Sequence, residues 1–209
     1  MEVLSFEEVR ILGSLIEKEN TTPEYYPLTI NSLINACNQK SSRNPVVTFD
    51  ESVVENTIQI LRDKKLVSKI TGPEIRVPKY QQIFTQHYQL TIQQTAVLCV
   101  LFLRGAQTIG EIKSRCYRIY EFKDLAETEE TLETLMNIED GPFVIKLPKD
   151  SGRENRYTHL FCGEPDMIPA VVKSVNFEEK IAELESELNS LRADYESLRE
   201  EFNSFKNQF

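Results

Sequence analysis

The apolar residues of this chain recur at helical spacing, and the pattern occurs twice along the sequence. The stretches LSFEEVRILGSL at 4–15 and LTIQQTAVLCVL at 90–101 share the pattern L-[ST]-[FI]-x-x-x-x-[IV]-L-x-x-L. Further on, TINSLINAC at 29–37 and TIGEIKSRC at 108–116 share T-I-x-x-[LI]-x-x-x-C. Apolar residues three and four positions apart lie on one face of a helix. The pattern therefore predicts two units that each begin with two helices in the same order.

Residues that cap helices support this prediction. A Ser or Thr at a helix start accepts a hydrogen bond from a free backbone N–H, and a Glu or Gln three residues later returns one. Such pairs are Ser5 with Glu8, Thr48 with Glu51, Thr91 with Gln94, and Thr108 with Glu111. We expect third helices at about 49–64 and about 124–137 from their apolar spacing. Their apolar faces consist of Val54, Ile58 and Leu61, and of Leu125, Leu132 and Leu135.

Each third helix is followed by two short β-rich runs around a turn. These are KLVSKI-TGPE-IRVPKY at 65–80 and FVIKL-PKDSGREN-RYTHLF at 143–161, and a turn between two such runs favours a hairpin. Three helices and a hairpin are the elements of a winged helix-turn-helix domain. We therefore predict an α+β fold that is mainly α with small β-hairpins, with tandem winged helix-turn-helix domains at 1–88 and 89–163.

The C-terminal region has a different pattern. The two prolines of GEPDMIPAV indicate a linker at 164–175, and apolar residues then recur with the alternating three- and four-residue spacing of a heptad repeat. This predicts a coiled-coil helix at 176–209. Its seam is formed by Phe177, Ile181, Leu184, Leu188, Leu191, Tyr195, Leu198, Phe202 and Phe205.

Charges beside this seam favour a parallel homodimer. The pairs that would face each other are Lys180 with Glu185, Glu187 with Arg192, Asp194 with Arg199, and Glu201 with Lys206. All are opposite in sign, which stabilises the parallel arrangement. The alternative is a single amphipathic helix that folds back onto the winged-helix pair.

Composition narrows the class of protein. With 40% hydrophobic and 27% charged residues, the 209-residue chain resembles an ordinary globular protein. Its net charge is −9, and none of the predicted segments is net basic. The longest apolar run, 96–103, is too short to span a bilayer. The start, MEVLSFEEVR, lacks the features of a secretion signal, so we expect no membrane association and a cytoplasmic location.

The four cysteines are scattered along the chain. Neither His87 nor His159 lies at a metal-ligand spacing from any of them. We therefore expect no metal and no other cofactor. Cys37 and Cys116 fall on apolar helix faces, where a reduced cysteine behaves as a small buried hydrophobe.

Three stretches carry a resemblance to a known family. LTINSLINACNQKSSRNPV, AVLCVLFLRGAQTIGEI and RYTHLFCGEP resemble signature runs of the YceH family of uncharacterised bacterial proteins, over roughly residues 5 to 165. Departures are small: Ala106 and Ile109 stand where the family more often has proline, and Thr158 where it often has methionine. The resemblance implies a tandem winged-helix protein with no established activity, and it supplies no site residues.

Enzyme motifs are missing from the sequence, including a phosphate-binding G-x-x-x-x-G-K-[ST] loop, a G-x-S-x-G elbow and H-E-x-x-H. We therefore expect a protein that is not an enzyme. A winged helix usually presents the start of its third helix to the DNA major groove. Here those starts carry Asp50, Glu51 and Glu55, and Asp124, Glu127, Glu129 and Glu130. Because phosphates repel carboxylates, these helices are poor candidates for contact with DNA.

Other polar residues are candidate contacts for a nucleic acid or an acidic partner. They are Lys40, Ser41, Ser42 and Arg43 after the second helix, Arg115 and Arg118 in the second unit, and Lys149, Arg153 and Arg156 in the second wing. Their alternative roles are to keep loops solvated or to pair with helix carboxylates. Two hypotheses follow: a dimeric protein-interaction or regulatory module with an unidentified protein partner, and a DNA-binding transcriptional regulator that uses loops and wings.

Overall fold

The computed structural model describes residues 2–148 and 154–164, and in the C-terminal region residues 192, 195, 196 and 199. The chain divides into two units, Met1–Pro165 and Asp166–Phe209, each considered by itself. The predicted coiled-coil seam lies outside the described residues except for Tyr195, which is helical with an exposed side chain. Two of the candidate contact residues, Lys149 and Arg153, also lie outside them.

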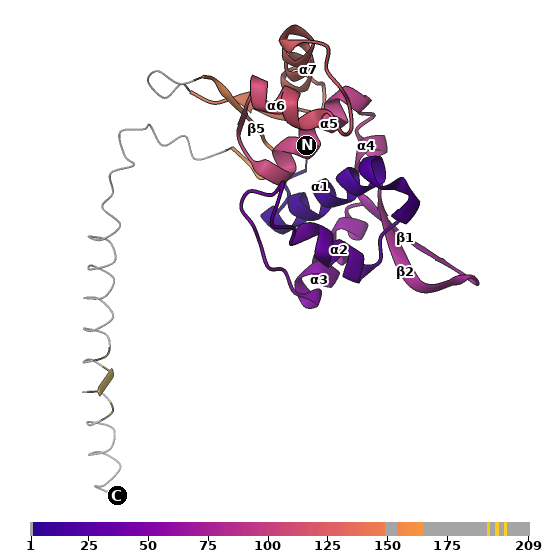
Figure 1. Ribbon diagram of the computed structural model, residues 1–209. Coiled ribbons are helices and arrows are strands. Elements are labelled where there is room, and N and C mark those ends of the chain that lie inside the picture. Colours follow the sequence, from indigo (N-terminus) through magenta and orange to yellow (C-terminus); the bar gives the residue numbers. More distant parts are fainter. Residues whose placement is uncertain (1, 149–153, 165–191, 193–194, 197–198, 200–209) are drawn as a thin grey trace, which may run out of the picture. The chain divides into compact units, whose positions relative to one another are not determined.

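The first repeat consists of helices followed by an antiparallel pair of strands (Figure 1). Its elements are α1 (Phe6–Thr21), the short 3-10 helix η1 (Pro23–Tyr25), α2 (Ile30–Cys37), α3 (Glu51–Asp63), β1 (Val67–Gly72) and β2 (Ile75–Gln82). A short helix, α4 (Phe84–His87), connects it to the second repeat.

The second repeat follows the same order. Its elements are α5 (Ile92–Arg104), β3 (Gln107–Thr108), α6 (Ile109–Cys116), α7 (Leu125–Met136), β4 (Val144–Lys146) and β5 (Arg156–His159). Helices and small antiparallel sheets together confirm the α+β class. None of the helices in the described part of the chain combines the length and the apolar character that a membrane span requires.

Most of the predicted helix starts are confirmed, and one is wrong. Capping boxes are present at Ser5, Thr91 and Thr108. However, Thr48 does not cap α3: the cap is Asp50, whose carboxylate accepts a hydrogen bond of 2.9 Å from the backbone N–H of Val53. Phe49, the residue before this cap, is held outside the helix by the side-chain amide of Asn38. The amide donates to the Phe49 carbonyl and accepts from the Phe49 N–H, each at 2.8 Å.

The predicted apolar faces of the third helices are confirmed with one exception. Val54, Ile58 and Leu61 are buried in α3, and Leu132 and Leu135 are buried in α7. Leu125 was predicted to join them, but its side chain is 50% exposed. It is the first residue of α7, where the buried face is completed by Thr128 and Thr131.

The two hairpins share a feature that the sequence did not indicate. In both repeats, the chain just before the second helix pairs with the last strand of the hairpin. In the first repeat, Leu28 and Tyr80 exchange backbone hydrogen bonds of 3.1 and 2.7 Å. In the second, β3 pairs with β5 in a sheet of order β3-β5-β4. Each hairpin is thereby fixed to the start of the second helix of its own repeat, α2 or α6.

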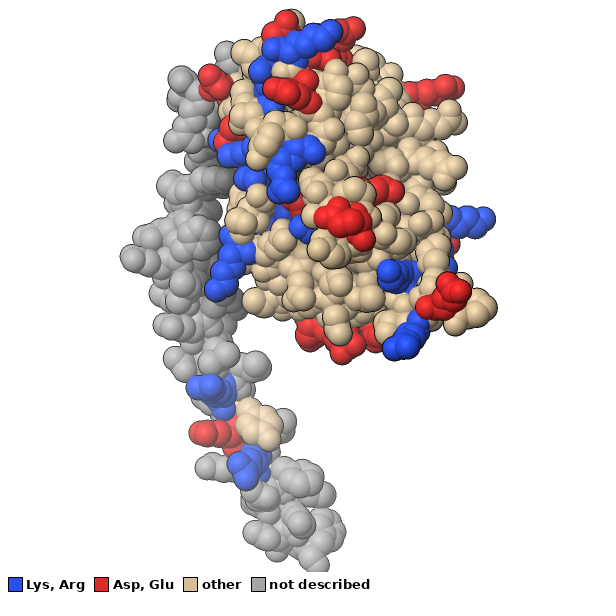
Figure 2. Space-filling model, turned by 45° about the vertical axis from the view of Figure 1, so that its right-hand side comes forward, with Lys and Arg blue, Asp and Glu red and all other residues tan. Residues whose placement is uncertain are grey.

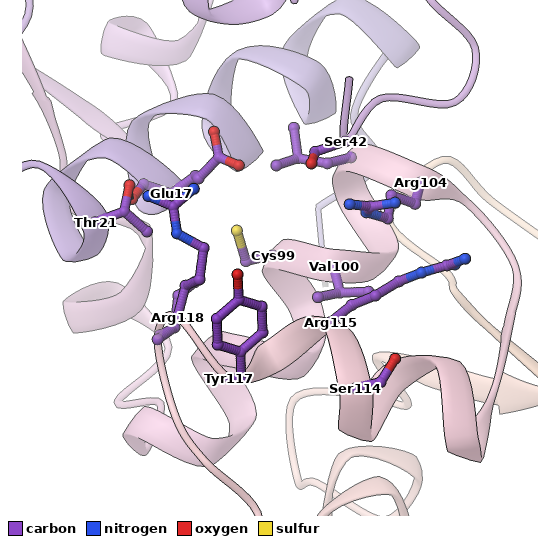
Figure 3. A pocket seen from close by; sticks show the side chains of 12 residues that line it. Glu17, Thr21, Ser42, Cys99, Val100, Arg104, Ser114, Arg115, Tyr117 and Arg118 are labelled. Carbon is purple, nitrogen blue, oxygen red and sulfur yellow. The ribbon is translucent and has the colours of Figure 1, made fainter. Parts of the chain in front are cut away.

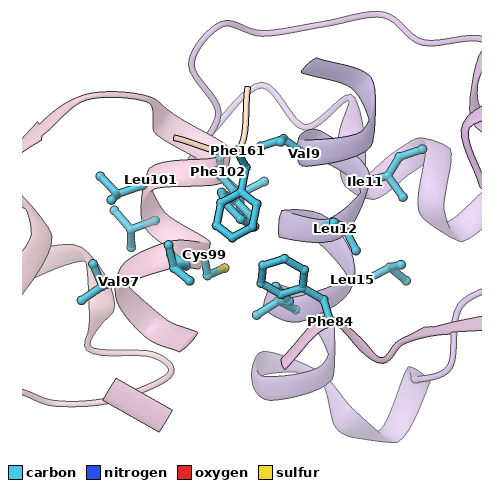
Figure 4. Packing of buried hydrophobic residues seen from close by; sticks show 14 of the residues in the cluster. Val9, Ile11, Leu12, Leu15, Phe84, Val97, Cys99, Leu101, Phe102 and Phe161 are labelled. Carbon is cyan, nitrogen blue, oxygen red and sulfur yellow. The ribbon is translucent and has the colours of Figure 1, made fainter. Parts of the chain in front are cut away.

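The two repeats share one hydrophobic core, which lies between α1 and α5 (Figure 4). The helices approach closely at Gly13, where a Cβ would lie only 3.0 Å from side-chain atoms of Phe102 and Leu103. Gly13 and Cys99 are equivalent positions of the two repeats, and they meet here: the Cys99 thiol lies 3.5 Å from the Gly13 carbonyl oxygen. The division of the chain into two winged-helix domains, at 1–88 and 89–163, stays a prediction.

Aromatic side chains fill the rest of this core. Phe84 of α4 packs edge-to-face against Phe102 and Phe161, with ring centroids 5.5 and 5.2 Å apart. Backbone bonds also join the repeats, from the Leu4 N–H to the Phe161 carbonyl at 2.7 Å and from the Asn44 N–H to the Leu103 carbonyl at 2.8 Å. The shared core and these backbone bonds therefore hold the two repeats in one arrangement, so a surface can be built from residues of both.

Candidate binding surfaces

The loop after α2 holds one of its predicted contact residues inside the protein. Arg43 is buried. Its guanidinium donates to both carboxylate oxygens of Glu17, at 2.7 and 3.2 Å, and to the Ala36 carbonyl, at 3.1 and 2.8 Å. Because α2 ends at Cys37, the Ala36 carbonyl has no partner within the helix. Arg43 therefore joins the end of α2 to α1, and its donors are directed away from the surface.

Glu17 is ionised in this arrangement. Burial raises the pKa of its carboxyl group, but hydrogen bonds from Arg43 and the charges of Arg43 and Lys18 outweigh burial, so the net shift is downward. Lys18 lies 3.4 Å from the same carboxylate. The negative charge of Glu17 is thus matched within the protein.

The other residues of this loop lie at or near the surface. Lys40 and Ser41 are exposed, whereas Ser42 is half-buried and has a left-handed backbone, with φ of 60°. Ser42 also lines a cleft between the two repeats. The loop thus separates into a surface part, a cleft part and a buried part.

This cleft has a volume of about 170 Å³. Figure 3 shows Arg118 extending from the turn after α6 toward Glu17 and Thr21 on α1, while Arg104 and Arg115 lie across the cleft on the side of Ser42. The lining residues come from α1, the loop after α2, α5, α6 and the following turn. They are Glu17, Thr21, Ser42, Cys99, Val100, Leu103, Arg104, Ser114, Arg115, Tyr117, Arg118 and Ile119.

Positive charge exceeds negative charge in the cleft. Arg104 and Arg118 form no ion pair with any residue that the structure describes. Arg115 pairs with Glu111 at 3.2 Å, and Glu111 is shared with Arg156 at 3.5 Å. The pKa of the Arg104 guanidinium is lowered, first by burial and then by the charge of Arg115.

The structure brings together three residues of the predicted set, Ser42, Arg115 and Arg118, and leaves Lys40 and Ser41 out of the cleft lining. Arg156 is not among the lining residues; it donates to the Ala106 carbonyl at 2.8 Å and lies 3.5 Å from the Glu111 carboxylate. Arg104 was missed by the sequence interpretation. It ends the apolar helix α5, and the signal that identifies it is the FLRG sequence, in which Gly105 closes the helix with a φ of 68°.

The exposed faces of the third helices carry acidic and neutral side chains. On α3 they are Glu51, Ser52, Glu55, Asn56, Gln59, Ile60 and Asp63; on α7 they are Leu125, Ala126, Glu129, Glu130, Glu133 and Thr134. No lysine or arginine within either described helix is exposed. In Figure 2, Lys and Arg form a band down the left-hand side of the body, and carboxylates gather at its lower end, where Figure 1 places α3. The exposed faces of α3 and α7 are therefore acidic, and Arg62 of α3, which is half-buried, is the one lysine or arginine within these two helices.

One carboxylate predicted at the start of α7 has an internal role. Glu127 accepts hydrogen bonds from the Tyr120 hydroxyl at 2.5 Å and from the Lys123 backbone N–H at 2.8 Å. The Tyr120 bond is the main reason that the pKa of Glu127 is lowered. Glu127 therefore orders the turn before α7. The exposed acidic face of α7 is formed by Glu129, Glu130 and Glu133.

Buried cysteines add no reactive group to these surfaces. Burial raises the pKa of Cys37 to about 11 and that of Cys116 to about 12, which keeps both as neutral thiols at pH 7. Their predicted role as buried hydrophobes is confirmed. Within the described residues, His, Cys, Asp and Glu form no group of three or more that would hold a metal ion.

Comparison with known proteins identifies the family. Residues 4–153 match the family described as "Protein of unknown function, DUF480". The chain is 47% identical over 184 residues to a UPF0502 protein of Solibacter usitatus, covering 85% of this chain and 87% of the relative. It is 46% identical over 187 residues to a UPF0502 protein of Vibrio campbellii, covering 85% and 86%. The chain therefore belongs to this uncharacterised family, which confirms the resemblance drawn from its sequence.

Proposed function

We propose that this protein is a tandem winged-helix module that binds another protein and catalyses no reaction. Two repeats of three helices and a hairpin support the winged-helix assignment. In each repeat, pairing of the hairpin with the chain before the second helix adds support, because it fixes the hairpin beside the helices as a wing.

The acidic exposed faces of α3 and α7 carry the proposal. A DNA-binding winged helix places its third helix in the major groove, between two rows of phosphates. Carboxylates at Glu129, Glu130 and Glu133 would oppose that approach, since affinity for a duplex comes largely from Lys and Arg. The same carboxylates are complementary to a basic protein surface.

Exposed aliphatic side chains within these faces define the partner further. Ile60 on α3 and Leu125 on α7 are 48% and 50% exposed, and each lies on a helix with exposed carboxylates. Interfaces commonly have an apolar centre and a polar rim. We therefore assign the partner as a protein with a basic surface around an apolar contact.

A quantitative capture experiment tests this function. The full chain is used to capture proteins from native cells, with and without nuclease, and the captured protein is measured against a charge-reversed variant, Glu129→Lys with Glu130→Lys and Glu133→Lys. We expect the variant to lose the partner because its α7 face becomes basic, and we expect nuclease to have no effect. Equal capture by the variant would contradict the proposal.

A matched control carries the same charge change elsewhere. Three exposed carboxylates outside the third helices are reversed together: Glu24→Lys, Glu74→Lys and Glu139→Lys. The control is expected to capture the partner as the wild type does. Loss in both variants would attribute capture to net charge and not to α7.

The proposal includes a homodimer formed through the C-terminal region, on the basis of the heptad pattern. Sedimentation of the full chain and of a chain ending at Pro169 tests it. We expect a dimer and a folded monomer respectively, because residues 1–165 form a compact unit of their own. A monomeric full chain at tens of micromolar would remove the dimer from the proposal.

The second candidate function is DNA binding through loops and wings. The observation that favours it is the cluster of Arg104, Arg115 and Arg118 beside the exposed Lys40 loop. In that arrangement, the arginines would contact phosphates without sequence-specific readout by a helix. Binding that falls steeply with salt and tolerates any sequence would support it.

A further inference from the structure

We propose that the cleft lined by Arg104, Arg115 and Arg118 is a binding site for a small ligand that carries a phosphate group. This site is distinct from the acidic α7 face and does not depend on the proposed protein partner. It lies between the two repeats, since Ser42 and Thr21 come from the first and the arginines come from the second.

Unmatched positive charge is the first reason. Arg104 and Arg118 have no ion-pair partner among the described residues, and the carboxylate of Glu111 is shared between Arg115 and Arg156. Cations that approach one another without an anion repel, and the repulsion is stronger where solvent is partly excluded. A bound anion removes this cost.

The one carboxylate in the cleft does not supply that anion. Glu17 is held by Arg43 at 2.7 Å, and Lys18 lies 3.4 Å from it. The side chain of Arg43 is fully buried. Because Glu17 is already matched by these two cations, the charges of Arg104 and Arg118 remain available to a ligand.

The donor groups favour phosphate over other anions. A guanidinium presents parallel N–H donors that fit phosphate oxygens, and arginines lie on both sides of the cleft (Figure 3). Ser42 and Tyr117 also line the cleft, and a hydroxyl can donate to a phosphate oxygen; the Ser114 hydroxyl donates to the Glu111 carbonyl instead, at 3.3 Å. A phosphate monoester carries about −1.5 to −2 charges at pH 7, which suits several cations better than a single carboxylate does.

The size of the cleft limits the ligand. Its volume of about 170 Å³ is below the roughly 300–1,000 Å³ that is usual for sites enclosing drug-sized molecules. The cleft thus encloses a phosphate group and leaves the remainder of the ligand outside. Tyr117 lies between Arg118 and Arg115 (Figure 3) and is 66% exposed, so its ring offers an aromatic face to that remainder.

Calorimetric titration of the full chain with inorganic phosphate and with glycerol 3-phosphate tests the proposal, at constant ionic strength set by chloride. We expect a Kd of about 1 mM or tighter for at least one of the two. Arg104→Gln with Arg118→Gln is expected to weaken this binding by about tenfold or more. The matched control, Lys69→Gln with Arg76→Gln on the β1–β2 hairpin, removes two exposed cations and is expected to bind as the wild type does.

Thermal unfolding separates ligand binding from a structural role. Without phosphate, the Arg104→Gln and Arg118→Gln variant is expected to unfold at the same temperature as the wild type or higher, because repulsion is relieved. Added phosphate should raise the midpoint of the wild type but not that of the variant. An unliganded variant that unfolds at a clearly lower temperature would assign these arginines a structural role and overturn the proposal.

Other ligand classes give distinct outcomes. Equal phosphate binding by wild type and variant would overturn the assignment of the site. Binding of citrate with no response to either phosphate compound would overturn the assignment of the ligand. Duplex DNA that binds through Arg104 and Arg118 while both phosphate compounds fail would also overturn it, and would assign the cleft to a nucleic-acid backbone.

Discussion

The loops that follow α2 and α6 occupy the same place in the two repeats, and each contains an arginine with a different role. In the first, Arg43 turns inward and pairs with Glu17 at 2.7 Å. In the second, Arg118 is exposed and reaches across the cleft without an ion pair among the described residues. An arginine in the loop after the second helix is therefore not by itself evidence of a contact surface. What decides the role is whether another element provides a carboxylate and a free carbonyl at that point.

The largest expected effect separates these two arginines. Arg43→Met leaves Glu17 charged and partly buried and the Ala36 carbonyl without its donor, so we expect a loss of about 3–5 kcal/mol in the free energy of unfolding. Arg118→Met is the matched control, with an expected change within about 0.5 kcal/mol, as for an exposed side chain. Urea denaturation of both variants measures the difference. Similar values would contradict the assignment of separate roles.

A second pair of residues extends the comparison to pH. Whereas the charge of buried Arg43 is paired, His159 in the second repeat is half-buried, and its buried Nδ1 atom forms no hydrogen bond within the described residues. Burial lowers the pKa of His159 to about 4 from 6.5. Between these values the unfolded chain binds a proton that the folded protein does not, so stability falls as the pH is lowered. The contribution of His159 is about 3 kcal/mol between pH 7 and pH 4.

Replacing His159 by Phe isolates this contribution. The wild type also loses stability in acid through carboxyl groups with lowered pKa, Glu17 and Glu111 among them, and the variant retains that part. Urea denaturation at pH 7, 5 and 4 should therefore show a shallower decline in the variant. Parallel declines would show that His159 is not protonated on unfolding in this range.

The smallest expected effect concerns the start of α3. Asp50→Ala should lower stability by much less than Arg43→Met does, since it removes only the exposed side chain that bonds the Val53 N–H. The pKa of Asp50 is lowered mainly by this bond, so the contribution is present in full above the ordinary pKa of the carboxyl group and is lost as the pH falls through its lowered pKa. Thr48→Ala is expected to change stability by less than about 0.5 kcal/mol. A larger effect of Thr48→Ala would contradict the assignment of Asp50, and not Thr48, as the N-cap of α3.

Local chemistry explains which parts of the fold were predictable. Ser5, Thr91 and Thr108 bond within their own first helical turn, so a stretch of four residues contains all the information. Thr48 matched the same pattern, but Asp50 lies closer to the helix and the Asn38 amide holds the chain between them. Competing local signals are resolved only by contacts from elsewhere in the chain.

The candidate sites were less predictable because their contacts join distant residues. Arg43 and Glu17 are 26 positions apart, and no short pattern relates them. Arg104 and Arg118 share a cleft because α5 and α6 pack together, and Arg104 is hidden in an apolar sequence. In contrast, the acidic faces of α3 and α7 follow from helical spacing alone. Single-helix surfaces were therefore predictable, whereas surfaces built from several elements were not.

Fluorescence anisotropy with genomic DNA fragments and the full chain tests the central claim, that the acidic third helices do not read DNA. The account predicts binding no tighter than the usual non-specific range of about 10⁻⁴–10⁻⁶ M at physiological salt, with affinity falling steeply between 50 and 200 mM salt. A fragment bound at nanomolar concentration throughout that range would contradict the protein-interaction function and establish a DNA-binding regulator in its place.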